Sequence, residues 1–327
     1  MPTLKLWTNN VVKIGLIRLI PAQERKNANK GVDNMMYNAK ELRDRKEKEL
    51  CKRLGLYALG HPVPPCLAII QVGNVPESNK YVGNKLKALE RVGMAYRHIH
   101  VSENVTTQDL LDMIDGLNKD KNVHGVMVQL PLPKHVETRQ VLDAIDPIKD
   151  VDGLSSASLS ALALELSNYE CTHMPCTVAG VLEILHDMGH RNPAGGLDVK
   201  GKNVVVLGKG ITSGLPLTHY LIMQGANVVN LASKCSEEDR YKYIKNADII
   251  VSCVGVPHLI DVKKVPLKCT LVNVGMSVNE EGKLVGDYDH ILADELGIKC
   301  TSVVNCSGIM TVHQLLENVM NAFAYQV

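Results

Sequence analysis

The chain has 327 residues, of which 45% are hydrophobic and 22% are charged, as in a globular protein with enough core for two domains. Its formal net charge of +1 gives no reason to expect a nucleic acid or an acidic membrane surface as a partner. No apolar run reaches the length of a membrane span, and nine cysteines without CxxC pairs indicate buried thiols in a reducing compartment.

Residues 1–34 are predicted to form a tail or a targeting segment. The first thirty carry one acid, Glu24, against six basic side chains: Lys5, Lys13, Arg18, Arg25, Lys26 and Lys30. A basic segment poor in acids is typical of a mitochondrial presequence, although serine is absent here. We therefore expect a cytoplasmic protein, with the mitochondrial matrix as the alternative. The charged stretch 37–54 is predicted to form a helix that ends near Gly55.

From residue 66 the pattern alternates between strands and helices, which predicts a parallel sheet with helices on its faces. Strands are predicted at Cys66–Val72, 96–101 and 123–129, with helices after Ser78, over 107–117 and over 139–145. Ser78 is a suitable N-cap for the first of these helices. An acidic turn at 149–153 and a linker rich in Ser, Ala and Leu then lead to Pro175.

Tyr81 and Lys85 lie four residues apart, so their side chains meet on one helical face beside an apolar stripe. A lysine at the rim of a buried surface is partly desolvated, which lowers its pKa, and a neighbouring phenol can share a proton. Gln129 ends the third strand before two prolines, which place it at the carboxyl edge of the sheet. This spacing more often reflects an amphipathic tyrosine and a solvated lysine on an ordinary helix than a catalytic pair. The pair becomes a catalytic candidate only together with further motifs.

The second half contains a candidate dinucleotide site. A helix over 177–188 precedes a strand, Asn203–Leu207, which runs into Gly208, Lys209, Gly210 and Gly214 and then a helix. Glycines let the backbone approach a pyrophosphate at a helix N-terminus, although the spacing here is GxGxxxG. Strands at 227–231, 248–253, 271–274 and 299–304 complete a doubly wound sheet. The fold class is therefore α/β, with an N-terminal parallel-sheet domain and a Rossmann-type domain.

The end of the second Rossmann strand indicates which nicotinamide cofactor is bound. NAD-specific sites usually carry an acid there to hold the ribose 2′-hydroxyl, but no acid occurs before Glu237. Ser233 and Lys234, with Lys209 in the glycine loop, would instead suit a 2′-phosphate. Solubilising surface charge explains the two lysines equally well at this point.

Four motifs occur in order: YVGNK at 81–85, VQLPLP at 128–133, KDVDG at 149–153 and VVLGKGITSGLP at 205–216. With them the chain resembles the bifunctional methylenetetrahydrofolate dehydrogenase/methenyltetrahydrofolate cyclohydrolase family over roughly residues 35–327. The resemblance implies a folate-binding catalytic domain (35–176, completed by a C-terminal helix at 309–327), a Rossmann domain (177–308), a cleft between them and a homodimer. It implies NADP as cofactor, with NAD less favoured, and tetrahydrofolate derivatives as partners. The implied reactions are oxidation of 5,10-methylenetetrahydrofolate and hydrolysis of the methenyl product to 10-formyltetrahydrofolate.

The resemblance also implies roles for single residues. Lys85 resembles the catalytic lysine, Tyr81 a tyrosine that stacks on or near folate, Gln129 the partner of that lysine and Asp152 a contact of the pterin; these four form the implied catalytic set. The implied substrate-binding residues are Tyr81, Val128, Gln129, Leu130, Asp152, Gly308, Met310 and Thr311. The implied cofactor-binding residues are Gly208, Lys209, Gly210, Ser233 and Met276, and no metal is expected.

Two stretches differ from the family pattern. CTPxG is replaced by Cys176-Thr-Val-Ala-Gly180, and the loop TPVPGGVGPMT reads TSVVNCSGIMT at 301–311, without three prolines and two glycines. We expect a more mobile loop and weaker folate binding. A non-catalytic or monofunctional folate- or nucleotide-binding homologue is therefore the alternative. A short-chain dehydrogenase is disfavoured, because in that class the glycine loop precedes the YxxxK pair.

Overall fold

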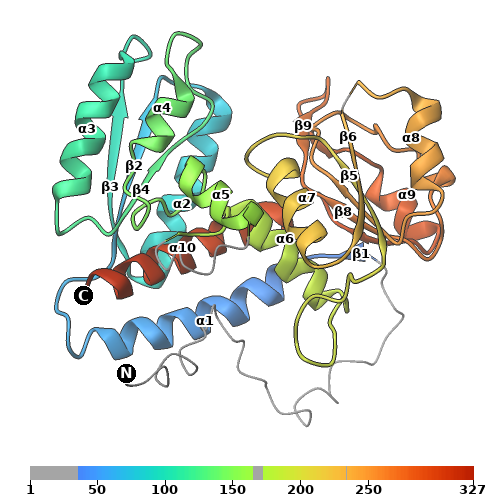
Figure 1. Cartoon of the computed structure of the whole chain (residues 1–327), viewed down its shortest axis with the longest axis horizontal. Coiled ribbons are helices and arrows are strands. Elements are labelled where there is room, and N and C mark those ends of the chain that lie inside the picture. Colours follow the sequence, from blue (N-terminus) through green and yellow to red (C-terminus); the bar gives the residue numbers. More distant parts are fainter. Residues whose placement is uncertain (1–35, 165–171, 233) are drawn as a thin grey trace, which may run out of the picture.

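The computed structural model describes residues 36–164, 172–232 and 234–327, which form two α/β lobes (Figure 1). This confirms the predicted fold class. The tail or targeting segment predicted for residues 1–34 and the phosphate-binding role predicted for Ser233 lie outside the described residues. Within the described ranges, no helix combines the length and the apolar character needed to cross a bilayer.

The first lobe is built on a three-stranded parallel sheet in the order β3-β2-β4. Alternate residues of the central strand point to opposite faces, so Leu67 and Ile69 pack into one core and Ala68 and Ile70 into another. Its elements are α1 (Lys40–Tyr57), β2 (Cys66–Val72), α2 (Pro76–Val92), β3 (Ala95–Val101), α3 (Thr107–Lys119), β4 (Gly125–Val128) and α4 (Thr138–Asp143).

Helix α2 begins earlier than the sequence predicted. Pro76 occupies the first turn and Val75 is the N-cap, so the predicted N-cap at Ser78 is wrong and that side chain is buried. The fixed φ of proline suits the first helical turn, where its missing N–H has no partner to lose. The helix ends at Gly93, whose φ of 81° lies in the left-handed region that glycine adopts freely.

The second lobe contains a six-stranded parallel sheet in the order β1-β11-β8-β7-β5-β6. Its elements are β5 (Asn203–Leu207), α7 (Gly214–Met223), β6 (Asn227–Leu231), α8 (Glu237–Ile244), β7 (Ile249–Ser252), β8 (Thr270–Asn273), α9 (His290–Glu295) and β11 (Lys299–Thr301). An antiparallel hairpin, β9 (Met276–Val278) and β10 (Leu284–Gly286), follows β8. The strands predicted at 203–207 and 227–231 are confirmed to the residue.

Strand β1 (Met36–Tyr37) was not predicted, and it joins the second lobe. It pairs in parallel with β11, after which α1 crosses to the first lobe (Figure 1). The predicted domain limits at 35, 176 and 308 remain a prediction, but this pairing shows that residues 36–37 belong to the sheet of the other lobe.

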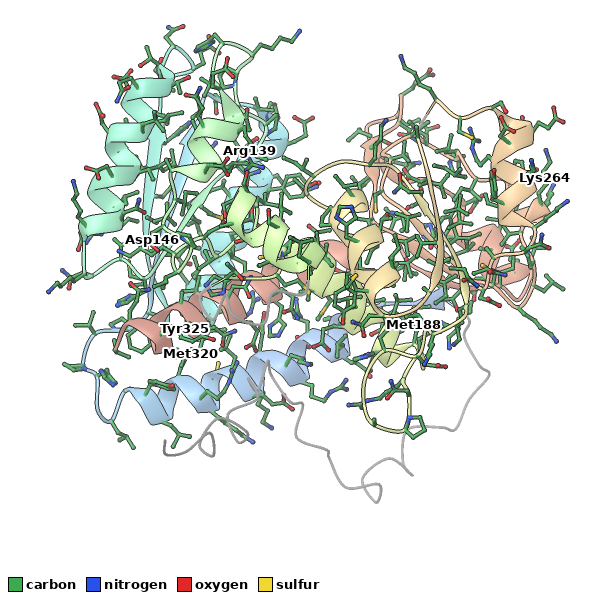
Figure 2. All side chains as sticks on the ribbon, in the orientation of Figure 1. Arg139, Asp146, Met188, Lys264, Met320 and Tyr325 are labelled. Atoms are coloured by element: carbon green, nitrogen blue, oxygen red, sulfur yellow. The ribbon has the colours of Figure 1, made fainter. Side chains whose placement is uncertain are left out.

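Three helices lie between or beneath the two sheets: α5 (Ser156–Leu164), α6 (Cys176–Asp187) and α10 (Ser307–Gln326) (Figure 1). Helix α5 falls where the sequence predicted a linker, which is a correction. Helix α10 starts in the core of the second lobe with Met310 and continues into that of the first with Met320, while Met188 after α6 is buried in the second (Figure 2). It crosses α6 at Gly180, where a Cβ would lie only 3.1 Å from the carbonyl carbon of Met310.

Candidate active site

Lys85 on α2 and Gln129 after β4 are joined directly. The Nζ of Lys85 donates a hydrogen bond of 2.8 Å to Oε1 of Gln129. Gln129 is only 9% exposed, and its Nε2 donates to the carbonyl of Leu130 at 2.7 Å, which orients the amide oxygen towards the lysine. The predicted position of Gln129 at the carboxyl edge of the sheet is confirmed, since it directly follows β4.

Asp152 lies within electrostatic reach of the Lys85 amine. Burial lowers the pKa of Lys85, and the charges of Asp152 and Cys176 oppose that shift. Burial raises the pKa of Asp152, opposed by Lys85 and reinforced by the charge of Asp150. Both directions favour the uncharged forms, while the attraction between the charged amine and the charged carboxylate opposes them. Lys85 and Asp152 are each partly exposed, which leaves them accessible to a ligand.

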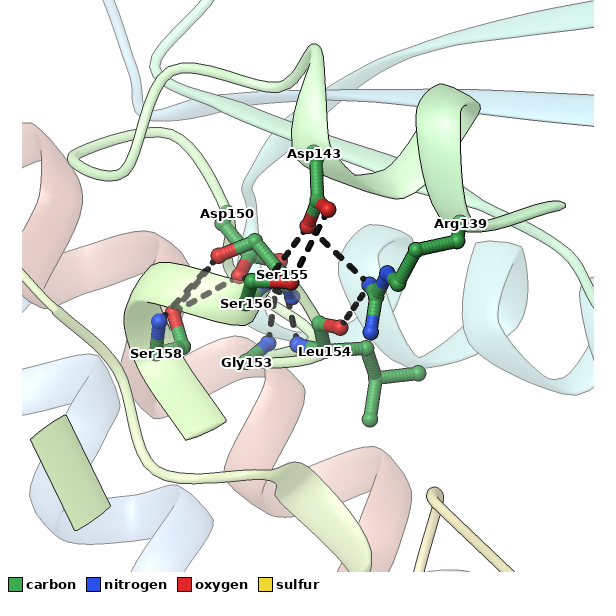
Figure 3. Close-up of polar contacts among 8 residues, drawn as sticks. All are labelled: Arg139, Asp143, Asp150, Gly153, Leu154, Ser155, Ser156 and Ser158. Atoms are coloured by element: carbon green, nitrogen blue, oxygen red, sulfur yellow. Dashed lines mark hydrogen bonds and ion pairs between the residues drawn. The ribbon is translucent and has the colours of Figure 1, made fainter. Parts of the chain in front are cut away.

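Asp150 accepts hydrogen bonds from the residues that follow it in the turn after β4, Gly153 to Ser158 (Figure 3), and Asp152 belongs to the same turn. Its carboxylate is 1% exposed and accepts hydrogen bonds from the N–H groups of Gly153 (3.1 Å), Leu154 (3.3 Å) and Ser155 (2.9 Å) and from Oγ of Ser158 (2.7 Å). Several donors compensate a buried charge that forms no ion pair with the described residues. The sequence left open whether Asp150 and Asp152 are turn residues, and Asp150 has that role.

Neighbouring side chains hold the same segment from other directions. Lys149 donates to three backbone carbonyls at the end of α3, those of Leu117 (3.0 Å), Asn118 (2.8 Å) and Asp120 (2.9 Å). Asn318 on α10 donates to the carbonyls of Val151 (2.9 Å) and Met174 (3.1 Å). Asp143 accepts from the N–H (2.6 Å) and Oγ (2.9 Å) of Ser156 at the start of α5 (Figure 3). The backbone on both sides of Asp152 is therefore fixed by hydrogen bonds from Lys149 and Asn318.

Tyr81 lies one helical turn before Lys85 and is 40% exposed. Burial and the charge of Glu77 raise the pKa of its phenol. Within the described part of the chain, no hydrogen bond joins Tyr81 to Lys85, so the structure does not support the expected sharing of a proton between them. An exposed aromatic ring beside a partly buried lysine can instead offer a face on which a flat ligand stacks.

The other predicted substrate-binding residues differ in accessibility. Val128 and Met310 are buried in the cores, so their side chains pack within the protein and their contact with folate remains a prediction. Gly308 is close to Met276, because a Cβ at position 308 would lie 3.8 Å from Cε of Met276. Thr311 is partly exposed, and its Oγ1 donates to the carbonyl of Ser307 at 2.9 Å.

The glycine loop between β5 and α7 has the geometry of a phosphate cradle. Gly208 has a φ of 96°, and a Cβ there would lie 2.8 Å from the carbonyl oxygen of Cys253. A Cβ at Gly214 would collide with the carbonyl oxygen of Gly208, whereas one at Gly210 would meet open space. Gly208 and Gly214 thus let the loop fold tightly, and Gly210 leaves room for a phosphate at the start of α7. These residues fit a dinucleotide.

The end of β6 is tied to this loop. Nδ2 of Asn230 donates to the carbonyl of Gly208 at 3.0 Å and to Oγ1 of Thr218 at 2.8 Å. Lys234 is exposed beyond the strand, and the first acid, Glu237, pairs with Lys264 at 2.6 Å. Glu237 therefore has a cationic partner on the protein surface.

Two family models match the chain. The model described as the tetrahydrofolate dehydrogenase/cyclohydrolase catalytic domain matches residues 37–152, and that of its NAD(P)-binding domain matches residues 175–327. The chain belongs to the tetrahydrofolate dehydrogenase/cyclohydrolase family. This confirms the predicted family and the NAD(P)-binding character of the second half.

Curated relatives and solved structures of the same family also match this chain. The bifunctional protein FolD of Staphylococcus aureus is 37% identical over 258 residues, which are 79% of this chain and 86% of the relative. The structure of the bifunctional FolD enzyme of Campylobacter jejuni has a TM-score of 0.81 at 32% identity, covering 89% of this chain and 98% of that one. The FolD structure of Trypanosoma brucei, complexed with NADP cofactor and an inhibitor, has a TM-score of 0.80 at 28% identity and covers 89% of this chain and 97% of that one.

The loop in which this chain departs from the family pattern has anchors of its own. Asn305 stands where the pattern has glycine and adopts a φ of 60°, which asparagine tolerates better than most side chains. The N–H of Ser302 donates to the carbonyl of Tyr37 at 2.8 Å, and Cys306 is buried. Weaker folate binding through this loop remains a prediction.

Sequence reasoning did not single out Cys176 as a neighbour of the lysine. Its Sγ donates to the carbonyl of Val151 at 3.2 Å, and burial raises the pKa of the thiol well above its usual value. The sequence marks Cys176 only by its position at the start of the CTVAG stretch, which departs from the family pattern. Among the described residues, no cluster of three His, Cys, Asp or Glu side chains has the arrangement of a metal site.

Proposed function

We propose that this chain oxidises 5,10-methylenetetrahydrofolate to the 5,10-methenyl form with NADP and then hydrolyses that product to 10-formyltetrahydrofolate. Family membership supports both activities. The observation that carries the proposal is the group formed by Lys85, Gln129 and Asp152, with a hydrogen-bonded amine whose pKa is lowered. The glycine loop of the second lobe supplies the place for the cofactor.

The oxidation needs a site that tolerates a developing cation. Loss of a hydride from the methylene bridge leaves a positive charge shared by two folate nitrogens, and NADP, when bound, accepts the hydride. A fixed cation beside the folate would oppose this change, so an amine that is readily neutral suits it better. Burial of Lys85 provides that property, and Gln129 holds the amine in place without adding charge.

The hydrolysis needs a base and a proton carrier. Water attacks the methenyl carbon, loses a proton to the base, and the carbon–nitrogen bond then breaks as a proton reaches the departing nitrogen. In our proposal the neutral Lys85 accepts the first proton and delivers the second. Asp152 supports the protonated amine between the two steps, since its charge raises the lysine pKa.

NADP is proposed over NAD. The loop from Gly208 to Gly214 fits a pyrophosphate, and two exposed lysines flank it in sequence, Lys209 in the loop and Lys234 beyond β6. The first acid after β6 is Glu237, which lies beyond the strand end at the start of α8 and pairs with Lys264. A charged contact to a 2′-phosphate is typically stronger than a neutral hydrogen bond.

The assembly and the compartment are proposals that the resemblance and the N-terminal composition support. We propose a homodimer, which light scattering on the purified chain would test. We propose a cytoplasmic location, with the mitochondrial matrix as the alternative. Imaging the full chain and a chain lacking residues 1–34, each fused to a fluorescent protein, separates the two.

The activity assay mixes the purified protein with methylenetetrahydrofolate and either NADP or NAD, and follows reduced cofactor by absorbance. A second cuvette receives methenyltetrahydrofolate without cofactor, and its decay is compared with the spontaneous rate. Both signals are expected from this chain. One signal alone would identify a monofunctional homologue, and neither would identify a binding protein.

A further inference from the structure

Asp287, between β10 and α9, is a fully buried acid that the proposed chemistry does not use. Its carboxylate is 0% exposed and accepts hydrogen bonds from Oγ of Ser252 (2.6 Å) and from the N–H groups of Val254 (2.9 Å) and Val256 (2.9 Å). No ion pair reaches it from the described residues. Its charge is therefore stabilised by a set of donors that all come from the end of β7 and the loop after it.

The same carboxylate fixes the segment after β8. A Cβ on Gly275 would collide with both carboxylate oxygens and with the N–H nitrogen of Gly255. Asn273 closes the arrangement, because its Nδ2 donates to the carbonyl of Gly275 at 2.7 Å and its Oδ1 accepts from the N–H of Asp287 at 2.8 Å. Asp287 thus locks two loops together at the carboxyl ends of adjacent parallel strands.

These two loops, after β7 and after β8, lie next to the glycine loop and form the floor of the cofactor site. The carbonyl of Cys253 faces Gly208, and the segment after β8 leads directly into Met276, which reaches towards Gly308 at the start of α10. In doubly wound sheets a dinucleotide lies across the carboxyl ends of the strands. The adenosine half belongs at β5 and β6, so the nicotinamide half is expected over the ends of β7 and β8.

We propose that Asp287 is a positioning residue for hydride transfer, which holds the two loops under the nicotinamide in register with the folate site of the first lobe. The proposal rests on the proposed function, and it predicts a separation of the two activities. Lys85 and Asp152 lie on the other lobe, so hydrolysis of methenyltetrahydrofolate without cofactor does not depend on this floor.

The test compares Asp287→Asn with Asp289→Asn. Asp289 is a matched control two residues away, whose carboxylate accepts from the N–H groups of Ile291 and Leu292 at the start of α9 and forms no hydrogen bond with either loop among the described residues. An amide at 287 presents an NH₂ group to donors, so the loops shift. Because a displacement of about 1 Å can cost roughly a hundredfold in rate, dehydrogenase kcat should fall by about that factor. Hydrolysis without cofactor should match that of the control, whereas the unfolding temperature should fall because three buried donors lose their carboxylate acceptor.

Ser252→Ala provides a milder variant in case Asp287→Asn does not fold. It removes one of the three donors, so a loss of about fivefold to tenfold in dehydrogenase activity is expected, again without loss of hydrolysis. Calorimetry gives a readout without turnover, in which NADP binds several-fold more weakly to either variant than to the control. Parallel loss of both activities, or unchanged dehydrogenase activity in folded Asp287→Asn, would overturn the proposal. An unmodified protein without either activity would instead contradict the proposed function.

Discussion

Replacing Lys85 with Met removes the amine but keeps an unbranched side chain on α2. Two effects on stability oppose each other. Loss of the 2.8 Å hydrogen bond to Gln129 costs about 1 kcal/mol. Removal of the amine also removes the cost of desolvating its charge, which is the effect that lowers the pKa of Lys85. The melting temperature is therefore expected to change by only a few degrees, at about 2–4 °C per kcal/mol for a chain of this size.

The effect on catalysis should be much larger. General acid–base catalysis typically contributes about 10²- to 10⁴-fold, so cyclohydrolase activity should fall by about a thousandfold, or roughly 4 kcal/mol in the barrier. Dehydrogenase activity should fall by a smaller factor, because the remaining contacts still align folate and nicotinamide. NADP binding should be unchanged, and Tyr81→Phe should be milder than Lys85→Met because only a hydroxyl is lost.

The assay follows methenyltetrahydrofolate decay and NADPH formation in parallel samples. Lys87→Met is the matched control, because Lys87 is an exposed lysine on the same helix. Its rates should equal those of the unmodified protein. If Lys85→Met hydrolyses methenyltetrahydrofolate at the unmodified rate, Lys85 is a structural residue and the assignment of the site is wrong.

Three further predictions concern the cofactor, the altered loop and pH. Ser233→Glu should shift kcat/KM in favour of NAD, because the added acid repels a 2′-phosphate; equal or better use of NAD by the unmodified protein would contradict this. Ser302→Pro should cost about 1 kcal/mol in unfolding free energy, because it removes the N–H that donates to the carbonyl of Tyr37, while Val304→Pro should not. An equal effect of the two substitutions in urea unfolding would argue against that anchor. Burial and the cations of α1 lower the pKa of His313 from 6.5 to about 3. Between these values the unfolded state binds more protons than the folded state. The free energy of unfolding should therefore decrease as the pH is lowered, by at most about 1.4 kcal/mol per pH unit. His313→Gln should lessen this acid dependence, and an unchanged slope between pH 6.5 and 4.5 would show that other groups dominate.

Most strands of the two sheets were predictable, because their residues are apolar or alternating runs bounded by turn signals. Cys66–Val72 is buried along its whole length, and its limits were predicted to the residue. The composition rich in Ser, Ala and Leu predicts a linker, yet Ser156–Leu164 is a helix. The two-residue strand Met36–Tyr37 has no periodicity at all, and only its distant partner β11 makes it a strand.

The site was predictable where chemistry follows from local spacing. The partnership of Lys85 with Gln129 was expected from the family resemblance, and the structure supplies the hydrogen bond. The supports were not predictable, because Asp150 differs from Asp152 only in where its carboxylate points after folding. Asp287 likewise stands in an ordinary strand-to-helix connection, and its partners at 252–256 are remote in sequence.

The central claim is that one site, built around Lys85, Gln129 and Asp152, binds the folate that both activities use. A crystal structure of the protein with NADP and a folate analogue tests it most directly. We predict the pterin ring beside the Lys85 amine and the Asp152 carboxylate, the nicotinamide near Met276, and the pyrophosphate at Gly208–Gly210. A folate analogue bound away from the Lys85 amine would contradict the account.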